Sequence, residues 1–116
     1  MPASDKDAAP ALIIEYQGIH IDRLSRRVQA GERLLTLTAT EYRLLEQLIT
    51  HPGQSFSRQE LRDSVIAGGA VVLERTIDKH IQGLRGKLGA YDLIETVRGV
   101  GYRCRADRAA DAVPTP

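Results

Sequence analysis

Apolar residues change their spacing twice along this chain of 116 residues, and this change restricts its fold more than any other feature. Between residues 12 and 37 they recur at short intervals between tight turns, which is typical of β-strands. From residue 38 to residue 88 they recur every three or four positions, as on one face of a helix, and from residue 94 the short interval returns. The sequence therefore predicts an α+β fold in which strands precede and follow a block of helices.

Four short segments near the start of the chain have strand character. They are residues 12–16, 19–22, 26–29 and 33–37. Because short strands joined by tight turns pair with their neighbours in sequence, we expect a small four-stranded antiparallel sheet.

Two helices are predicted to begin with the same signal. Residues 38–41 (TATE) and 57–60 (SRQE) each place a hydroxyl residue three positions before a glutamate, which is the pattern of a capping box. The first helix continues through an apolar stripe at residues 44–49 and ends at Pro52-Gly53. The second is shorter and ends at Gly68-Gly69.

A third helix is expected over about residues 73–88, with opposite character on its two sides. One side carries an apolar stripe that should pack on the core, formed by Ile77, Ile81, Leu84 and Leu88. Gly83 and Gly86 lie inside this helix, where each costs about 0.5–1 kcal/mol relative to alanine. Either an interaction other than helix propensity favours glycine at these positions or the helix is less stable.

The chain is expected to close with a β-hairpin. Residues 94–97 and 102–105 bracket a glycine-containing turn at 98–101, which carries Arg98 at its tip. The two ends of the chain are polar and unpatterned, so residues 1–11 and 106–116 are predicted to be disordered tails or linker remnants around one domain at 12–105.

Composition indicates the cellular compartment of the protein. The single Cys104 excludes an intramolecular disulfide and fits a reducing compartment. No apolar run approaches the roughly 18 residues of a membrane span, and residues 1–11 lack the basic and apolar regions of a signal peptide. The interpretation is a soluble, cytoplasmic protein.

Positive charge is concentrated in the last third of the chain. The net charge is only +1, but residues 1–73 carry eight Lys/Arg and nine Asp/Glu, whereas residues 74–108 carry eight and five. Such local asymmetry attracts phosphates. An ordinary solvated face is an equally good interpretation of the charge alone.

Catalysis and cofactor binding have little support in the sequence. The histidines and the cysteine, His20, His51, His80 and Cys104, lack the close pair spacing of a zinc site. The Gly-x-Gly at residues 99–101 is not followed by a helix, so a dinucleotide site is not expected. We therefore predict no enzymatic activity, no cofactor and no metal.

Two helices followed by a third that is apolar on one side and hydrogen-bonding on the other form the helix-turn-helix plan, whose last helix fits the DNA major groove. Lys79 and Arg85 can bind phosphate or guanine, and Gln82 can pair with adenine. Asp78 can accept a hydrogen bond from cytosine or, equally well, orient Arg75 or Lys79.

Three motifs occur in a characteristic order: residues 38–45 (TATEYRLL), residues 75–81 (RTIDKHI) with Leu84-Arg85, and residues 95–103 (ETVRGVGYR). Together they resemble the effector domain of OmpR/PhoB-type response regulators, over about residues 12–105. The resemblance implies a winged helix-turn-helix with an N-terminal four-stranded sheet, a three-helix core and a C-terminal β-hairpin wing. It also implies sequence-specific binding of double-stranded promoter DNA as a homodimer on direct repeats.

The resemblance also assigns roles. Arg75, Thr76 and Tyr102 would mainly hold phosphates, Lys79 and Gln82 would face base edges, and Arg98 would enter the minor groove. The predicted DNA-binding residues are Arg75, Thr76, Asp78, Lys79, Gln82, Arg85, Arg98 and Tyr102.

The chain departs from the family pattern in two places. Gln82, Gly83 and Gly86 stand where family members often carry basic residues, which predicts weaker affinity or a greater dependence on the wing. The loop at residues 67–73 resembles the family's RNA polymerase-contacting loop, but it is Gly-rich and apolar.

The receiver domain that such regulators carry has no counterpart in the sequence. The chain is thus either an excised output domain or a short regulator without a receiver. The alternative function is a winged helix that binds proteins and no longer reads DNA, which the near-neutral charge and the non-basic Gln82-Gly83 and Gly86 would suit.

Overall fold

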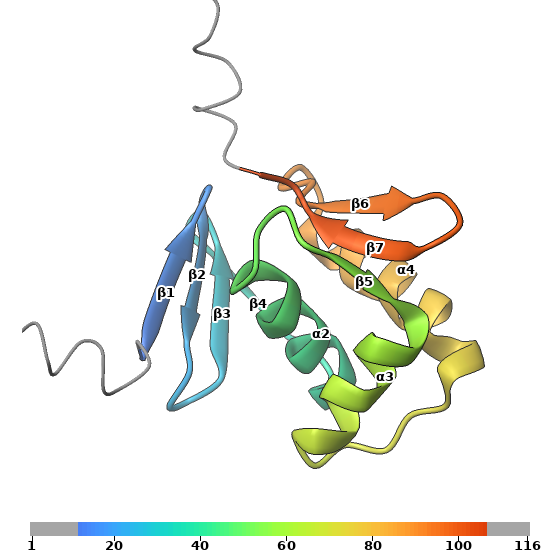
Figure 1. Ribbon diagram of the computed structural model, residues 1–116. Helices are drawn as coiled ribbons and strands as arrows, with labels where there is room; N and C mark the ends of the chain where they lie inside the picture. The colour runs from blue at the N-terminus through green and yellow to red at the C-terminus, as the bar shows by residue number, and fades with distance from the viewer. Residues whose placement is uncertain (1–11, 107–116) are drawn as a thin grey trace, which may run out of the picture.

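The computed structural model describes residues 12–106, so the expected tails at residues 1–11 and 106–116 lie outside the described residues except for Ala106. The chain begins with a four-stranded sheet of order β1-β2-β3-β4, in which each strand pairs antiparallel with the next (Figure 1). Its strands are β1 (Ile13–Tyr16), β2 (Ile19–Asp22), β3 (Arg27–Ala30) and β4 (Arg33–Leu35). This sheet confirms the prediction, although β4 ends two residues before the expected boundary at residue 37.

Three helices follow, as the period of the apolar residues predicted: α2 (Ala39–Ile49), α3 (Arg58–Ala67) and α4 (Ile77–Leu88). Both predicted capping boxes are present, with Thr38 and Glu41 at the start of α2 and Ser57 and Glu60 at the start of α3. Each box satisfies amide groups that would otherwise lack a partner at the helix start.

The third helix begins later than expected. Residues Glu74–Thr76 form a 3-10 turn, η1, and α4 starts only at Ile77, so the predicted start near residue 73 was wrong. No side chain caps η1 or α4. Instead, the Thr76 hydroxyl donates to the Leu73 carbonyl at 2.7 Å, a local bond that suits a tight turn better than a helix.

The predicted hairpin is part of a three-stranded sheet of order β5-β7-β6. Its strands are β5 (Ser55–Ser57), β6 (Ile94–Val97) and β7 (Gly101–Cys104). No pattern in the sequence indicated β5, because three residues are too few to show a period. Gly101 permits this pairing, since a β-carbon at that position would overlap the Phe56 carbonyl oxygen.

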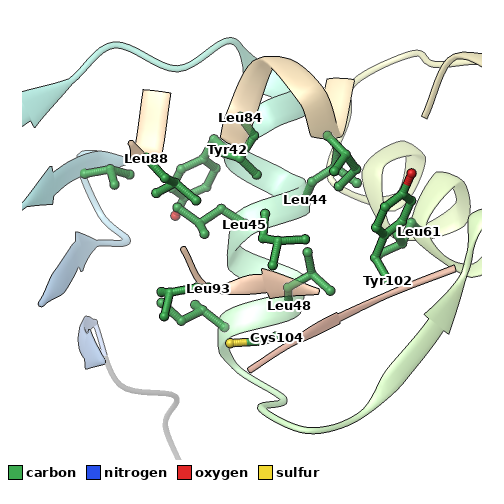
Figure 2. Packing of buried hydrophobic residues seen from close by; sticks show 14 of the residues in the cluster. Tyr42, Leu44, Leu45, Leu48, Leu61, Leu84, Leu88, Leu93, Tyr102 and Cys104 are labelled. Atoms are coloured by element: carbon green, nitrogen blue, oxygen red, sulfur yellow. The ribbon is translucent and has the colours of Figure 1, made fainter. Parts of the chain in front are cut away.

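One hydrophobic cluster joins the helices to the inner faces of both sheets. α2 lies between the first sheet and the other helices (Figure 1), and Figure 2 shows Leu45 and Leu48 of α2 in the middle of the cluster and Leu61 of α3 beside Tyr102. The predicted stripe of α4 is part of this cluster, since Ile77, Ile81 and Leu84 are fully buried. The architecture is the predicted winged helix-turn-helix.

Close contact with α2 explains one of the two glycines in α4. A β-carbon on Gly83 would lie 2.7 Å from Oε2 of Glu41, which is itself only 6% exposed. Oε1 of that glutamate accepts from the Thr38 amide at 3.0 Å and pairs with Lys87 Nζ at 2.6 Å. The carboxylate is therefore held in place and leaves no room for a larger residue at position 83.

We expect alanine to have opposite effects at the two glycines of α4. A β-carbon on Gly86 would meet no atom within 4 Å, so Gly86→Ala should raise the free energy of unfolding by about 0.5–1 kcal/mol through helix propensity. Gly83→Ala should lower the free energy of unfolding by about 1 kcal/mol, because the cost of overpacking against Glu41 outweighs the gain in helix propensity. Urea unfolding measures both values, and equal stabilisation by the two substitutions would contradict this account of the α2–α4 contact.

Candidate nucleic-acid interface

The exposed side of η1 and α4 carries most of the predicted contact residues. Arg75, Asp78, Lys79 and Gln82 are exposed there, and Arg98 is exposed in the turn between β6 and β7. Because the apolar stripe of α4 is buried, helical geometry leaves these side chains on the solvent side. The helix therefore presents hydrogen-bonding groups of several kinds along one face.

Three other predicted contact residues are engaged within the protein. The Thr76 hydroxyl donates to the Leu73 carbonyl, as described above. Arg85 is half-buried, and its Nη2 donates to the Ile94 carbonyl at 3.1 Å and to Thr96 Oγ1 at 2.8 Å. Tyr102 is only 4% exposed. Arg85 thus ties α4 to strand β6 of the wing.

Asp78 joins α4 to two other elements. Its Oδ1 accepts from the Tyr102 hydroxyl of β7 at 2.5 Å and from Arg58 Nε of α3 at 2.7 Å. The sequence suggested Arg75 or Lys79 as its partner, whereas the structure pairs it with Arg58. A partner that lies 20 residues away in the chain leaves no periodic signal.

These hydrogen bonds change the acid–base behaviour of the pair. The bond from Tyr102, and then that from Arg58, lowers the pKa of Asp78 from its ordinary value of 3.8. Burial, and then the hydrogen bond to Asp78, raises the pKa of Tyr102. The carboxylate is thus ionised and the phenol protonated across the neutral range, so the hydroxyl donates to the carboxylate.

In the last third of the chain, some of the positively charged side chains form salt bridges to acidic residues and others do not. Lys87 pairs with Glu41, while Arg103 and Arg105 pair with Glu95. Among residues 74–106, the cations that form no salt bridge to an acidic side chain are Arg75, Lys79, Arg85 and Arg98. All four belong to η1, α4 or the wing turn, so within residues 74–106 the uncompensated positive charge lies on the helix and the wing. Around the first sheet, Arg26, Arg27 and Arg33 also form no salt bridge to an acidic side chain of the described part of the chain.

The second half of α4 adds little charge to this face. Gln82 and Gly86 are exposed there, and Lys87 is directed to Glu41 of α2. This matches the departure seen in the sequence. Any anionic partner must therefore be held mainly by η1, the first turn of α4 and the wing.

Within residues 12–106, no three His, Cys, Asp or Glu side chains come together as a metal site would require. Nor does any helix of this described part have the length and apolarity to cross a bilayer.

An exposed polar helix set on a helical core beside a β-hairpin defines the class of winged helix-turn-helix domains. Comparison with known proteins agrees. The chain belongs to the family "Transcriptional regulatory protein, C terminal", whose model matches residues 31–104. This membership confirms the resemblance to the effector domain of OmpR/PhoB-type response regulators.

Among individual relatives, the chain is similar to the phosphate regulon transcriptional regulatory protein PhoB of Escherichia coli K12. The two are 44% identical over 94 residues, which cover 78% of this chain and 41% of PhoB. The chain therefore spans less than half the length of this relative.

Two solved structures of similar domains contain DNA. The DNA-binding domain of the response regulator AdeR, in complex with an intercistronic region, has a TM-score of 0.71 and 38% identity, covering 80% of this chain and 99% of that one. The DNA-binding domain of Klebsiella pneumoniae RstA, in complex with the RstA box, has a TM-score of 0.68 and 30% identity, covering 82% and 98%.

The stabilising contribution of Asp78 should depend on pH. Because its pKa is lowered in the folded state, the contribution is complete above the unfolded-state value and is lost as the pH falls through the folded-state value. Urea unfolding of wild type and Asp78→Asn between about pH 2 and pH 7 should show a difference that is constant above about pH 5 and shrinks below about pH 4. A difference independent of pH would contradict the proposed ionised junction.

Proposed function

We propose that this chain is the DNA-binding output domain of a bacterial transcription regulator and binds double-stranded DNA in a sequence-specific manner. The observation that carries the proposal is the position of the uncompensated cations. Arg75 in η1 and Lys79 and Arg85 in α4 belong to the segment that such domains insert in the major groove, and Arg98 lies in the turn at the tip of the wing. The AdeR and RstA complexes support DNA as the partner.

Separate roles follow for the exposed residues. Arg75 binds phosphate, while Lys79 and Gln82 contact base edges in the major groove. Arg98 enters the minor groove, where the negative potential is greatest when the groove is narrow. The expected phosphate contacts of Thr76 and Tyr102 stay predictions, since each hydroxyl would first have to release the acceptor that it now has.

The assembly is proposed by analogy with the family. Two copies bind a direct repeat in promoter DNA, in the cytoplasm. RNA polymerase contacts the loop at residues 67–73, where Val71 is 91% and Leu73 54% exposed. Exposed apolar side chains of this kind are typical of protein contact sites.

The alternative of a protein-binding module without DNA recognition predicts that the positive charges disperse. The cations of residues 74–106 that form no salt bridge gather on η1, α4 and the wing, which favours the DNA-binding function.

Selection from randomised duplex DNA, followed by fluorescence anisotropy at several salt concentrations, tests the proposal. An enriched repeated motif is expected. Affinity should fall as the salt concentration rises, because cations of the domain displace counterions from the phosphates. Arg98→Ala and Lys79→Ala should each weaken binding by about 1–3 kcal/mol, and Lys79→Ala should also relax the preference for one base pair.

Arg27→Ala provides the matched control. It removes one exposed positive charge from β3, in the first sheet, away from α4 (Figure 1). Its affinity should stay close to that of the wild type. Binding that is unchanged in both the Arg98 and the Lys79 variants would overturn the assigned roles, and a folded domain that binds no duplex even at low salt would favour the protein-binding alternative.

A further inference from the structure

Arg58, the first residue of α3, occupies a position that the sequence motifs did not point to. Its Nε donates to Asp78 Oδ1 at 2.7 Å, and its Cζ lies 5.4 Å from the centre of the Tyr102 ring. The first contact reaches the first turn of α4 and the second reaches β7. Arg58 therefore lies at the junction of the recognition helix and the wing sheet.

These two contacts orient the guanidinium but use only part of it. An arginine has five N–H groups in a planar fork, and the hydrogen bond to Asp78 takes one of them. The Tyr102 side chain is a second hydrogen-bonding neighbour of the guanidinium, and the Arg58 side chain is 40% exposed. An oriented and accessible fork of this kind suits a phosphate group, which arginine binds through paired N–H donors.

The partners of Arg58 are themselves committed to the junction. The Tyr102 hydroxyl has one proton, and it donates that proton to Asp78. Oδ1 of Asp78 accepts both hydrogen bonds. In this arrangement neither side chain offers a donor to a phosphate, whereas Arg58 has N–H groups beyond the one that Asp78 accepts.

We propose that Arg58 is a phosphate-binding residue of the DNA interface, and that Asp78 and Tyr102 are positioning residues that hold its guanidinium. The inference rests on the proposed DNA binding and adds a contact from α3 to those from α4 and the wing. It places the phosphate beside the first turn of α4, where a backbone contact sets how the recognition helix enters the groove.

Asp78 should respond to substitution in a direction that charge alone does not predict. Simple electrostatics predicts that Asp78→Ala strengthens binding, because the substitution removes a negative charge near the phosphates. Positioning predicts the opposite, because Arg58 loses the acceptor that orients it. The direction of the change in affinity therefore separates the two explanations.

Fluorescence anisotropy with the selected duplex tests both the phosphate-binding role of Arg58 and the positioning role of Asp78. Arg58→Ala should weaken binding about tenfold and make the salt slope shallower by about 0.9. Arg58→Lys should keep the slope and recover only part of the affinity, because the ammonium group lacks the fork. Asp78→Ala should weaken binding several-fold, but in the Arg58→Ala background it should cause no further loss.

A second experiment identifies the phosphate itself. Each phosphate of the selected duplex is replaced in turn by an uncharged methylphosphonate. At one position in each half-site, the replacement should weaken binding of the wild type and have no effect on Arg58→Ala. The Arg27→Ala control should respond as the wild type does, and circular dichroism melts establish that every variant compared is folded.

The outcomes separate the inference from the function on which it rests. A wild type that binds the duplex, with an unchanged slope in Arg58→Ala or tighter binding in Asp78→Ala, would overturn the role of Arg58 alone. Absence of binding by a folded wild type would overturn both. Should Arg58→Ala fail to fold, Arg58→Gln, which removes the charge but keeps a long polar side chain, replaces it in both experiments.

Discussion

Burial of one side of α4 is the constraint on which the rest of the structure depends. Ile77, Ile81 and Leu84 are completely inaccessible, and each such side chain contributes about 1.5–3 kcal/mol when removed from water. Once this stripe is packed against α2 and α3, the rotation of the helix about its own axis is set. The polar residues of α4 then lie on its exposed side as a consequence of helical geometry.

Buried charge fixes the neighbouring elements around this core. Glu41 caps α2, pairs with Lys87 and lies against Gly83, so one carboxylate determines how closely α2 and α4 approach. Glu46 has a similar role toward the first sheet, because it pairs with Arg43 of its own helix and with Arg23, which follows β2. Breaking such buried pairs leaves a charge without a partner, which is far more costly than losing an exposed pair.

A second group of polar contacts couples the recognition helix to the wing. Arg85 bonds to β6, and Asp78 bonds to Tyr102 of β7 and to Arg58 of α3. Major-groove and minor-groove contacts must be made together for both to contribute to specificity. Because the wing is hydrogen-bonded to the helix, the two keep a fixed relative position. Less conformational entropy is therefore lost when DNA is bound.

The sequence by itself determined the order of strands and helices, both capping boxes, the buried stripe of α4 and the exposed polar face opposite it. These features depend on residues close together in the chain, whose spacing of two or three to four carries the signal. The start of α4, strand β5 and the partner of Asp78 were decided only by the tertiary structure. β5 exists because Gly101 lets Phe56 approach β7, and Arg58 reaches Asp78 because α3 packs against α4. Contacts between residues distant in sequence depend on how the elements pack, and local spacing carries no information about them.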